Sequence, residues 1–365
     1  MKNLKIFKNA RVIVTGHTGF KGSWLTAWLN ELGSKVMGIS LNPHTSPSHF
    51  KVSKIGKNIK DVRLDIRNRK KLEKKIINFK PSFIFHLAAQ AIVGESYKNP
   101  YLTWDTNVFG TLNILESARK LKNKCSIVII TSDKCYFNKE IHYGYKETDT
   151  LGGKDPYSGS KASAEILIQS HINSFFKGNS KVRIATARAG NVIGGGDWAK
   201  NRIIPDCVRS WSKNNKAILR NPKSTRPWQH VLEAVGGYLC LAVNLAQNKK
   251  IHGESFNFGP NLSKEYSVLE IVKKMSKYWK NVTWQKMNKK QKNFFESELL
   301  RLNCNKSKKI LRWNSILKIE ELMSMVADWY RNYYVNKKNA SELTKKQINK
   351  YRELAIKRGL SWAKK

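Results

Sequence analysis

The stretch that decides the fold is Arg11-Val12-Ile13-Val14-Thr15-Gly16-His17-Thr18-Gly19-Phe20-Lys21-Gly22. Its opening residues are mostly apolar and β-branched, which predicts a buried strand, and the apolar run from Trp24 to Leu32 predicts a helix. The glycines between them allow a tight turn whose backbone N–H groups can approach a pyrophosphate at the positive end of that helix. This strand, glycine turn and helix predict a dinucleotide-binding fold, with candidate cofactor contacts at Gly16, Thr18, Gly19, Phe20 and Gly22.

The same strand-and-helix rhythm continues through the first half of the chain. Further buried strands are predicted at residues 35–41, 61–65, 81–87, 126–131 and 182–187. Strands that alternate with helices in this way form a parallel sheet with helices on both faces. We therefore predict an α/β fold with a doubly wound parallel sheet, whose ligands lie at the carboxyl ends of the strands.

The residues that follow these strands are candidates for contacts with a dinucleotide. Asn42 and Pro43 stand where an acidic residue would hold the ribose hydroxyls, and no arginine stands there for a 2′-phosphate, so NAD and NADP are not distinguished at this point. Asp65 and Ile66 follow the next strand, where Asp65 is either an adenine contact or a solvated strand end. Ala88 and Ala89, directly after the fourth strand, are small enough to let a dinucleotide pass over the strand ends. They and Leu87, the last residue of that strand, are therefore candidate contacts.

A second informative stretch is Asp155-Pro156-Tyr157-Ser158-Gly159-Ser160-Lys161. Asp155 suits an N-cap and Pro156 suits the first helical position, so a helix is predicted to begin here and to run to about Phe176. Residues four apart share a helix face, so Tyr157 and Lys161 can meet. A cation at ~4 Å can contribute about 4 kcal/mol, enough to lower the pKa of a phenol by about three units. Tyr333 and Lys337 show the same spacing, so the pair is also compatible with an ordinary helix surface.

Composition narrows the class of protein. The chain has 365 residues, 41% of them hydrophobic, which fits a folded protein with two domains. Its net charge of +42 raises the possibility of RNA binding, but the lysines are scattered, and a diphosphate substrate would be attracted by the same field. Five cysteines without a C-x-x-C pair predict reduced thiols in the cytoplasm, and no signal peptide or long apolar run is found.

The domain organisation follows from a change of pattern near residue 189. We predict a dinucleotide-binding domain over residues 1–188 and a substrate-binding domain over residues 189–335, some of whose segments return to the sheet. Residues 336–365 are predicted to be a lysine-rich helical tail, an appendage without an assigned role.

With the glycine turn, Asn107, Ser132 and the Tyr157/Lys161 pair in this order, the chain resembles the extended short-chain dehydrogenase/reductases. More narrowly, it is similar to the CDP-glucose 4,6-dehydratases. The glycine and tyrosine motifs are shared by the whole superfamily. The narrower resemblance depends on the glycine turn as far as Leu25 and on residues 131–136, 191–198, 202–206 and 226–231.

The resemblance implies an NAD-dependent lyase that converts CDP-glucose to CDP-4-keto-6-deoxyglucose, a precursor of deoxysugars such as those of O-antigens. Tyr157 would take the C4 hydroxyl proton, and Lys161 would stabilise the resulting charge and hold the nicotinamide ribose. Ser132 would hydrogen-bond the C4 oxygen, and Asp133 would protonate the departing C6 hydroxyl. An acid must keep its proton, so a raised pKa is predicted for Asp133. Asn107 is implied as a further cofactor contact.

Lys134 departs from the related dTDP-glucose dehydratases, in which a glutamate removes the C5 proton. An ammonium is not a base, so Lys134 would have to be neutral, or it would stabilise the enolate electrostatically while another group, such as Glu95, takes the proton.

The second half supplies candidate substrate contacts: Asn191, Arg202, Arg226 and His230. Arginine suits a diphosphate because its fork of donors matches phosphate oxygens. No cluster of ligands surrounds His17 or His230, so no metal is expected. The resemblance also implies a homodimer or homotetramer built from the helices near Tyr101 and Pro156. Two other interpretations stay open: a nucleotide-sugar 4-epimerase, and a non-catalytic dinucleotide- or RNA-binding protein.

Overall fold

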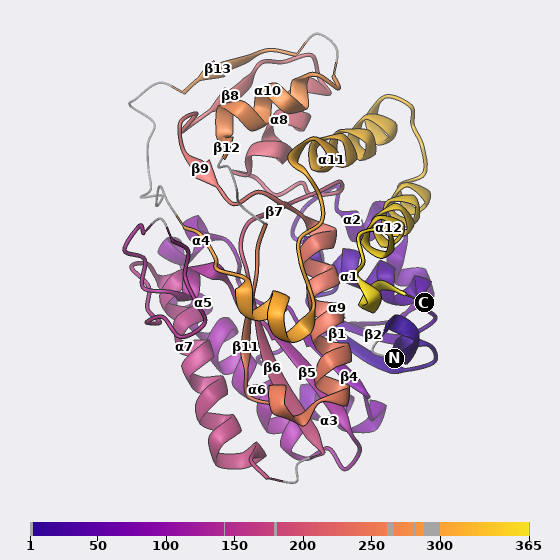
Figure 1. Ribbon diagram of the computed structural model, residues 1–365, viewed down its shortest axis with the longest axis vertical. Coiled ribbons are helices and arrows are strands. Elements are labelled where there is room, and N and C mark those ends of the chain that lie inside the picture. The colour runs from indigo at the N-terminus through magenta and orange to yellow at the C-terminus, as the bar shows by residue number, and fades with distance from the viewer. Residues whose placement is uncertain are drawn as a thin grey trace.

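The computed structural model describes residues 3–141, 143–178, 181–260, 266–279, 282–287 and 300–364. Its centre is a parallel sheet of seven strands in the order β3-β2-β1-β4-β5-β6-β11 (Figure 1). The strands are β1 (Arg11–Thr15), β2 (Lys35–Ser40), β3 (Lys60–Arg63), β4 (Phe83–His86), β5 (Cys125–Ile130), β6 (Val182–Ala189) and β11 (Ser255–Phe258). The predicted doubly wound parallel sheet is confirmed.

Helices cover both faces of the sheet because alternate residues of each buried strand point to opposite sides. Val12 and Val14 of β1 pack on the side of α1 (Phe20–Glu31) and α9 (Val231–Gln247), whereas Ile13 packs on the opposite side. That opposite side is covered by α3 (Arg69–Phe79), α6 (Gly110–Arg119) and α7 (Pro156–His171). Helix α6 is preceded by α4 (Val93–Lys98), α5 (Pro100–Trp104) and a π-helical turn, Asp105–Phe109.

A second group of elements lies beyond the carboxyl ends of the strands, above the sheet in Figure 1. It contains α8 (Ile203–Trp211), α10 (Val268–Ser276) and three small strand pairs. The pairs are β7 (Val192–Ile193) with β10 (Gln229–His230), β9 (Thr225–Arg226) with β12 (Tyr266–Ser267), and β8 (Ala217–Leu219) with β13 (Trp284–Lys286). Between β10 and β12 the chain goes back to the main sheet through α9 and β11, as expected for segments of the second half.

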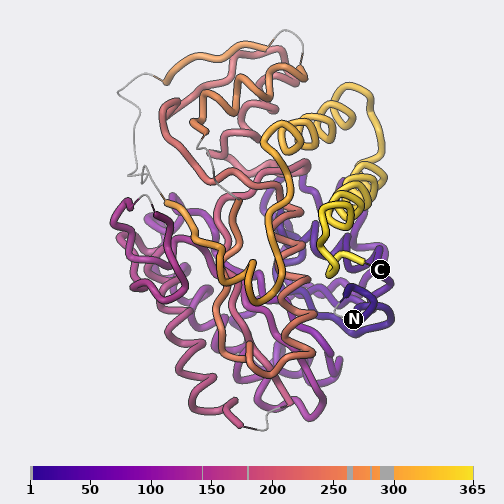
Figure 2. Tube along the Cα trace, in the orientation of Figure 1, coloured from indigo at the N-terminus to yellow at the C-terminus, as the bar shows by residue number. Residues whose placement is uncertain are grey.

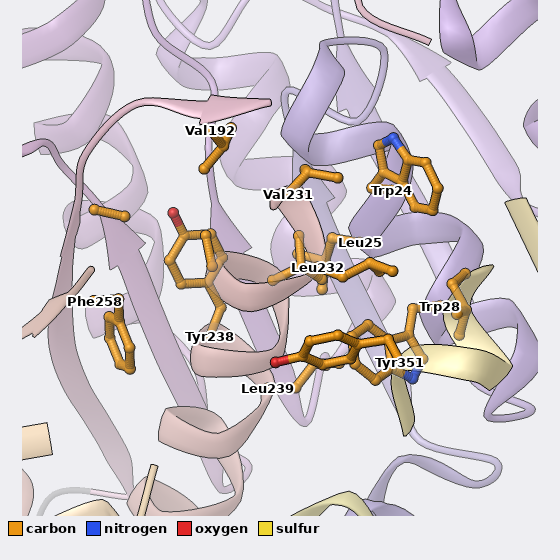
Figure 3. Packing of buried hydrophobic residues seen from close by; sticks show 14 of the residues in the cluster. Trp24, Leu25, Trp28, Val192, Val231, Leu232, Tyr238, Leu239, Phe258 and Tyr351 are labelled. Atoms are coloured by element: carbon orange, nitrogen blue, oxygen red, sulfur yellow. The ribbon is translucent and has the colours of Figure 1, made fainter. Parts of the chain in front are cut away.

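Residues between Ala340 and Ala363 contribute side chains to the core, so the prediction of an appendage is wrong. Helix α12 (Ala340–Lys357) packs against α1 and α11 (Ile319–Tyr334), and the short helix α2 (His49–Val52) contacts it as well. Tyr351 of α12 is fully buried beside Trp28 (Figure 3). Its hydroxyl donates to Glu233 Oε2 at 2.8 Å. This helix is amphipathic: its lysines lie mostly on the exposed face, and its apolar residues form a buried face. The lysine-rich composition of the segment alone does not indicate that buried face.

The two ends of the chain meet beside α12. The backbone N–H of Leu4 donates to the carbonyl oxygen of Lys364 at 3.1 Å, and the N and C labels lie next to each other in Figure 2. Trp362, close to the C-terminal end, is buried against Trp28. In the described part of the chain, no helix has the length and apolar character needed to cross a bilayer.

Candidate active site

The centre of the candidate site is the segment that follows β5. Ser132 caps a single 3-10 turn, Asp133–Cys135, and its hydroxyl accepts from the Lys134 N–H at 3.2 Å. The same hydroxyl donates to Asp133 Oδ1 at 2.9 Å, and its influence on the neighbouring phenol of Tyr157 is to lower the pKa of that phenol. The side chains of Ser132, Asp133 and Tyr157 are all buried.

Helix α7 begins where the sequence predicts. Asp155 Oδ1 accepts from the backbone N–H groups of Tyr157 and Ser158, both at 3.0 Å, and the Ser158 hydroxyl returns a bond to Asp155. This capping box fixes the first turn and therefore the position of Tyr157. Lys161 lies one turn further along the helix and is also buried.

The pKa of Tyr157 is not what the spacing of the tyrosine and lysine predicts. Burial raises it to about 12, although the hydrogen bond with Ser132 acts in the opposite direction. Burial also lowers the pKa of Lys161 to about 8, which weakens its hold on a proton. In the protein by itself, desolvation of the phenol therefore outweighs the effect expected from a neighbouring cation.

The predicted direction for Asp133 is confirmed. Burial raises the pKa of its carboxyl, while the ammonium groups of Lys134 and Lys21 and the Ser132 hydrogen bond offset part of that rise. The backbone also closes over this side chain, because a Cβ on Gly190 would lie 2.9 Å from Asp133 Oδ2. The fold thus provides a carboxyl group that holds its proton more tightly than an exposed aspartate.

Lys21 is a functional candidate that the sequence analysis missed. It lies in the first turn of α1, and its ammonium is directed to the carbonyl oxygen of Gly190, 3.5 Å away. Burial lowers its pKa to about 8, Asp133 raises it, and Arg202 and Lys161 lower it. The signal was present in the sequence, since a residue in the first turn after a glycine-rich loop faces the carboxyl ends of the strands.

The glycine turn has the form that a pyrophosphate requires. Gly16 has φ +72°, and a Cβ there would lie 2.7 Å from the backbone N of Ala88. A Cβ on Gly22 would lie 2.1 Å from the carbonyl oxygen of Gly16. The N-cap of α1 is Gly19, which makes no side-chain capping bond, so the positive end of the helix is left for an anion. These residues fit a dinucleotide.

The adenosine end of the site differs from the sequence prediction in one respect. An arginine does lie at the end of β2, because Arg63 of the neighbouring strand donates to the carbonyl oxygen of Leu41 at 3.0 Å. Its guanidinium also bonds Asp61 at 2.7 Å, which compensates its charge. Strand pairing brings the residue there from another part of the chain, and inspection of residues 35–43 alone does not show it.

Other predicted cofactor contacts have partners within the protein. Both carboxylate oxygens of Asp65 accept from the Arg67 side chain. Asn107 lies in the π-helical turn and bonds the backbone of Gln90 in both directions, while its amide also donates to Ser160 Oγ at 2.9 Å. Asn107 therefore ties the end of β4 to α7, and its contact with the cofactor stays a prediction.

His86 was also missed by the sequence analysis. It is buried at the end of β4 between Thr15, at 2.7 Å, and Thr111, at 3.1 Å. Thr15 in turn accepts from the backbone N–H groups of Leu87 and Ala88. His86 thus connects the strand end under the glycine turn to α6.

The predicted substrate contacts fall into two groups. Asn191 is exposed, Arg202 is half-buried and bonds Asp197 at 2.9 Å, and Arg226 donates to the carbonyl oxygen of Thr225 at 2.7 Å. His230 is fully buried beside Trp24, and its Nδ1 accepts from Leu232 N as the N-cap of α9. His230 therefore caps α9 from a buried position, and its contact with a substrate stays a prediction.

A buried ion pair lies next to the segment that carries Ser132 and Asp133. Glu165 of α7 and Arg188 of β6 form two bonds, at 3.0 and 2.9 Å, and both side chains are buried. The Thr131 hydroxyl donates to Glu165 at 2.5 Å, and Arg188 donates to the Tyr136 hydroxyl at 2.9 Å. The pair therefore joins α7 and β6 to both ends of the turn that carries Asp133.

Among the described residues, no three His, Cys, Asp or Glu side chains are grouped as potential metal ligands. His17, one of the histidines considered, bonds Asp61 at 2.9 Å instead.

Comparison with known proteins assigns the family. A family model described as GDP-mannose 4,6 dehydratase matches residues 13–326. The chain belongs to this family. The family consists of NAD-dependent nucleotide-sugar dehydratases within the extended short-chain dehydrogenase/reductase superfamily. Among curated relatives of the family, the CDP-glucose 4,6-dehydratase of Salmonella typhimurium is 40% identical over 356 residues, covering 96% of this chain and 98% of the relative.

Solved structures of similar proteins share the fold. The epimerase Mth375 of Methanothermobacter thermautotrophicus superposes with a TM-score of 0.75 at 21% identity, covering 94% of this chain and 96% of the other. The dTDP-glucose 4,6-dehydratase of Bacillus anthracis, solved in complex with NAD, gives a TM-score of 0.71 at 22% identity, covering 88% of this chain and 97% of the other.

Proposed function

We propose that this protein is a CDP-glucose 4,6-dehydratase that forms CDP-4-keto-6-deoxyglucose and water. The observation that carries the proposal is Asp133, a buried carboxyl with a raised pKa that is hydrogen-bonded to Ser132 beside Tyr157. An enzyme that removes a hydroxyl group needs such an acid. The 40% identity to the Salmonella enzyme over nearly the whole of both chains supports the choice of a CDP-sugar.

The glycine turn and Lys161 would hold NAD, which supplies the redox chemistry by accepting a hydride from C4 of the glucosyl unit and returning it to C6. The positive charge that NAD would bring to the site opposes the effect of burial on Tyr157, so that its ionised phenol can remove the proton of the C4 hydroxyl, and Ser132 hydrogen-bonds the C4 oxygen. Asp133 gives its proton to the C6 hydroxyl, which leaves as water. C5 gives its proton to a water molecule and regains one when the hydride returns to C6, while Lys134, whose charge acts on Asp133, stabilises the enolate in between.

Other features are consistent with this assignment. Glu95 is exposed and lies 3.9 Å from Lys98, so it is a poor candidate for the C5 base. The five cysteines are free thiols, which supports a cytoplasmic location. We further propose that the enzyme works as a homodimer or homotetramer through α5 and α7, on which Tyr101 and Ile166 expose apolar side chains.

A nucleotide-sugar 4-epimerase would use Tyr157, Lys161 and Ser132 in the same way. It would not need an acid for a C6 hydroxyl. The burial of Asp133 among Ser132, Lys21 and Gly190 therefore favours the dehydratase.

The test is incubation with CDP-glucose and NAD, followed by measurement of the alkaline absorbance of a 4-keto-6-deoxy sugar. We expect product with CDP-glucose, and we expect Tyr157→Phe to lose about a hundredfold or more in kcat. Conversion of dTDP-glucose or GDP-mannose instead would refute the substrate. Interconversion of glucosyl and galactosyl nucleotides without loss of water would refute the dehydratase.

A further inference from the structure

Helix α11 holds the segment that leads to Arg202. The Tyr330 hydroxyl donates to the carbonyl oxygen of Asp197 at 2.6 Å and accepts from the backbone N–H of the same residue at 3.0 Å. Tyr330 and Asp197 are both buried. A hydroxyl can donate and accept at the same time, so one phenol fixes both backbone groups of Asp197.

Two further residues of α11 contact the same segment. The Trp329 indole packs so closely on Gly195 that a Cβ there would overlap the ring. The indole N–H of Trp198 donates to the Tyr334 hydroxyl at 2.7 Å. Figure 1 shows α11 next to α10, in the group of elements beyond the carboxyl ends of the strands. Residues 195–198 are therefore held in place by a helix from a distant part of the sequence.

Asp197 in turn holds the guanidinium of Arg202. Its Oδ2 accepts from Arg202 Nη1 at 2.9 Å, and its Oδ1 accepts from the backbone N–H of Ala199 at 3.0 Å. The Asp197 side chain is 6% exposed, whereas the Arg202 side chain is 39% exposed. A guanidinium has several N–H donors, so a bond to one carboxylate leaves others for phosphate oxygens. The carboxylate is thus fixed inside the protein while the arginine stays accessible to a ligand.

The charge of Arg202 acts on the catalytic side of the site. Burial has the largest effect on the pKa of Tyr157 and on that of Lys21, and Arg202 acts to lower both values. Arg202 is also the N-cap of α8, at the point where the chain leaves this segment. Its guanidinium is therefore within electrostatic range of the residues that would handle the sugar, as a contact with the adjoining diphosphate requires.

We propose that Asp197 and Tyr330 are positioning residues that orient Arg202 toward the diphosphate of the nucleotide sugar. A mobile arginine loses conformational freedom when it binds phosphate, and this loss weakens binding. Asp197 fixes the arginine before the ligand arrives, and Tyr330 fixes Asp197. Helix α11 therefore contributes to substrate affinity through Arg202. This inference rests on the proposed dehydratase function and concerns the binding of its substrate.

The first experiment measures binding without turnover. The Kd of CDP is determined by calorimetry on the protein saturated with NAD. We expect Tyr330→Phe and Asp197→Ala each to raise this Kd about fivefold to tenfold, the effect of losing one hydrogen bond. Tyr334→Phe is the matched control, because its hydroxyl bonds Trp198 from the same helix, and it should keep the native Kd.

Steady-state kinetics give a second readout for the same variants. Neither Asp197 nor Tyr330 is proposed to touch a reacting atom, so KM for CDP-glucose should rise by about the same factor as the Kd of CDP. The value of kcat should change by less than about twofold. A fall in kcat with an unchanged KM would contradict a role in positioning Arg202.

A double-mutant cycle separates positioning from general support of the fold. Arg202→Ala should raise the Kd of CDP by about tenfold to a hundredfold, as expected for a hydrogen bond to a charged group. If Asp197 acts through Arg202, adding Asp197→Ala to Arg202→Ala should weaken binding no further. A purely structural role would weaken binding by the same factor in both backgrounds.

The outcomes distinguish this inference from the proposed function. An unchanged Kd of CDP in Tyr330→Phe and Asp197→Ala, or a further loss when Asp197→Ala is added to Arg202→Ala, would overturn the positioning role while leaving the dehydratase in place. Failure of the native protein both to bind CDP and to dehydrate CDP-glucose would overturn the two proposals together.

Discussion

At the scale of single residues, the site depends on ionisable groups whose pKa values are shifted by burial. Asp133 lies in the turn after β5, where Gly190 packs on its carboxyl group and the Ser132 hydroxyl donates a hydrogen bond to it. Its neighbours Lys134 and Lys21 act against the raised pKa without cancelling it. The chemistry of the residue is therefore set by contacts that come from three separate parts of the chain.

Asp133→Asn tests the acid. The amide cannot protonate the C6 hydroxyl, but it leaves Tyr157 and Lys161 in place, so the C4 oxidation should persist. We expect the absorbance of reduced nicotinamide to appear on mixing with CDP-glucose and NAD, while kcat for product falls by about 10²–10⁴. Asp155→Asn, which keeps a capping side chain at the start of α7, is the control and should form product at a rate near that of the native protein.

Lys21→Met tests the charge that faces Asp133. The ammonium of Lys21 lowers the pKa of Asp133, so its removal should raise that pKa further. Because the acid must be protonated, activity is lost as pH rises through the pKa of Asp133. The alkaline limb of the profile of kcat against pH should therefore move to higher pH in Lys21→Met and stay near the native position in Lys21→Arg. A limb that moves to lower pH, or the same shift in both variants, would contradict this electrostatic role.

At the scale of elements, local sequence patterns predict where helices and strands lie. They do not predict which functional residues of different elements come into contact. The strand over Arg11–Thr15 and the helix that begins at Pro156 follow from apolar runs and capping residues. Arg63 reaches the end of β2 only because β3 pairs with it, and Glu165 meets Arg188 only because α7 packs on β6. Such contacts join residues that are far apart in sequence, and periodicity within a single segment carries no information about them.

The buried pair of Glu165 and Arg188 provides a test at this scale. Arg188→Met leaves a carboxylate buried without its partner, so we expect the free energy of unfolding to fall by about 3–5 kcal/mol in urea titrations. The double variant Glu165→Leu/Arg188→Met removes both charges and should recover much of that loss. If the double variant were less stable than the single one, the cost would have to come from lost packing and not from an uncompensated charge.

At the scale of the whole molecule, three buried histidines connect separate layers. His49 stacks on Trp24 and bonds Ser23 and Thr344, His86 bonds Thr15 and Thr111, and His230 caps α9. Burial lowers the pKa of each of them to about 3. All three are therefore neutral in the folded protein near neutral pH.

These histidines predict how stability depends on pH. In the unfolded chain these histidines bind protons with an ordinary pKa of about 6.5, whereas in the folded protein they do not. Above that pH, protonation of the unfolded chain therefore does not reduce the free energy of unfolding. It should fall as pH drops from about 6.5 toward 3, by up to about 1.4 kcal/mol per pH unit for each histidine. Urea titrations at pH 7 and pH 5 measure the change. His49→Gln should reduce the slope, whereas replacement of the exposed Lys57 should leave it unchanged.

The position of residues 336–365 has a consequence for how the protein is made in the cell. A ribosome delivers the N-terminal half first, and domains commonly fold as they emerge. Here α1, which begins at Phe20, is covered by α12, which begins only at Ala340, and the backbone N–H of Leu4 donates to the carbonyl oxygen of Lys364. Helix α12 must therefore leave the ribosome before this face of α1 is covered, and a chain truncated before Ala340 would expose an apolar surface on α1 that favours aggregation or proteolysis.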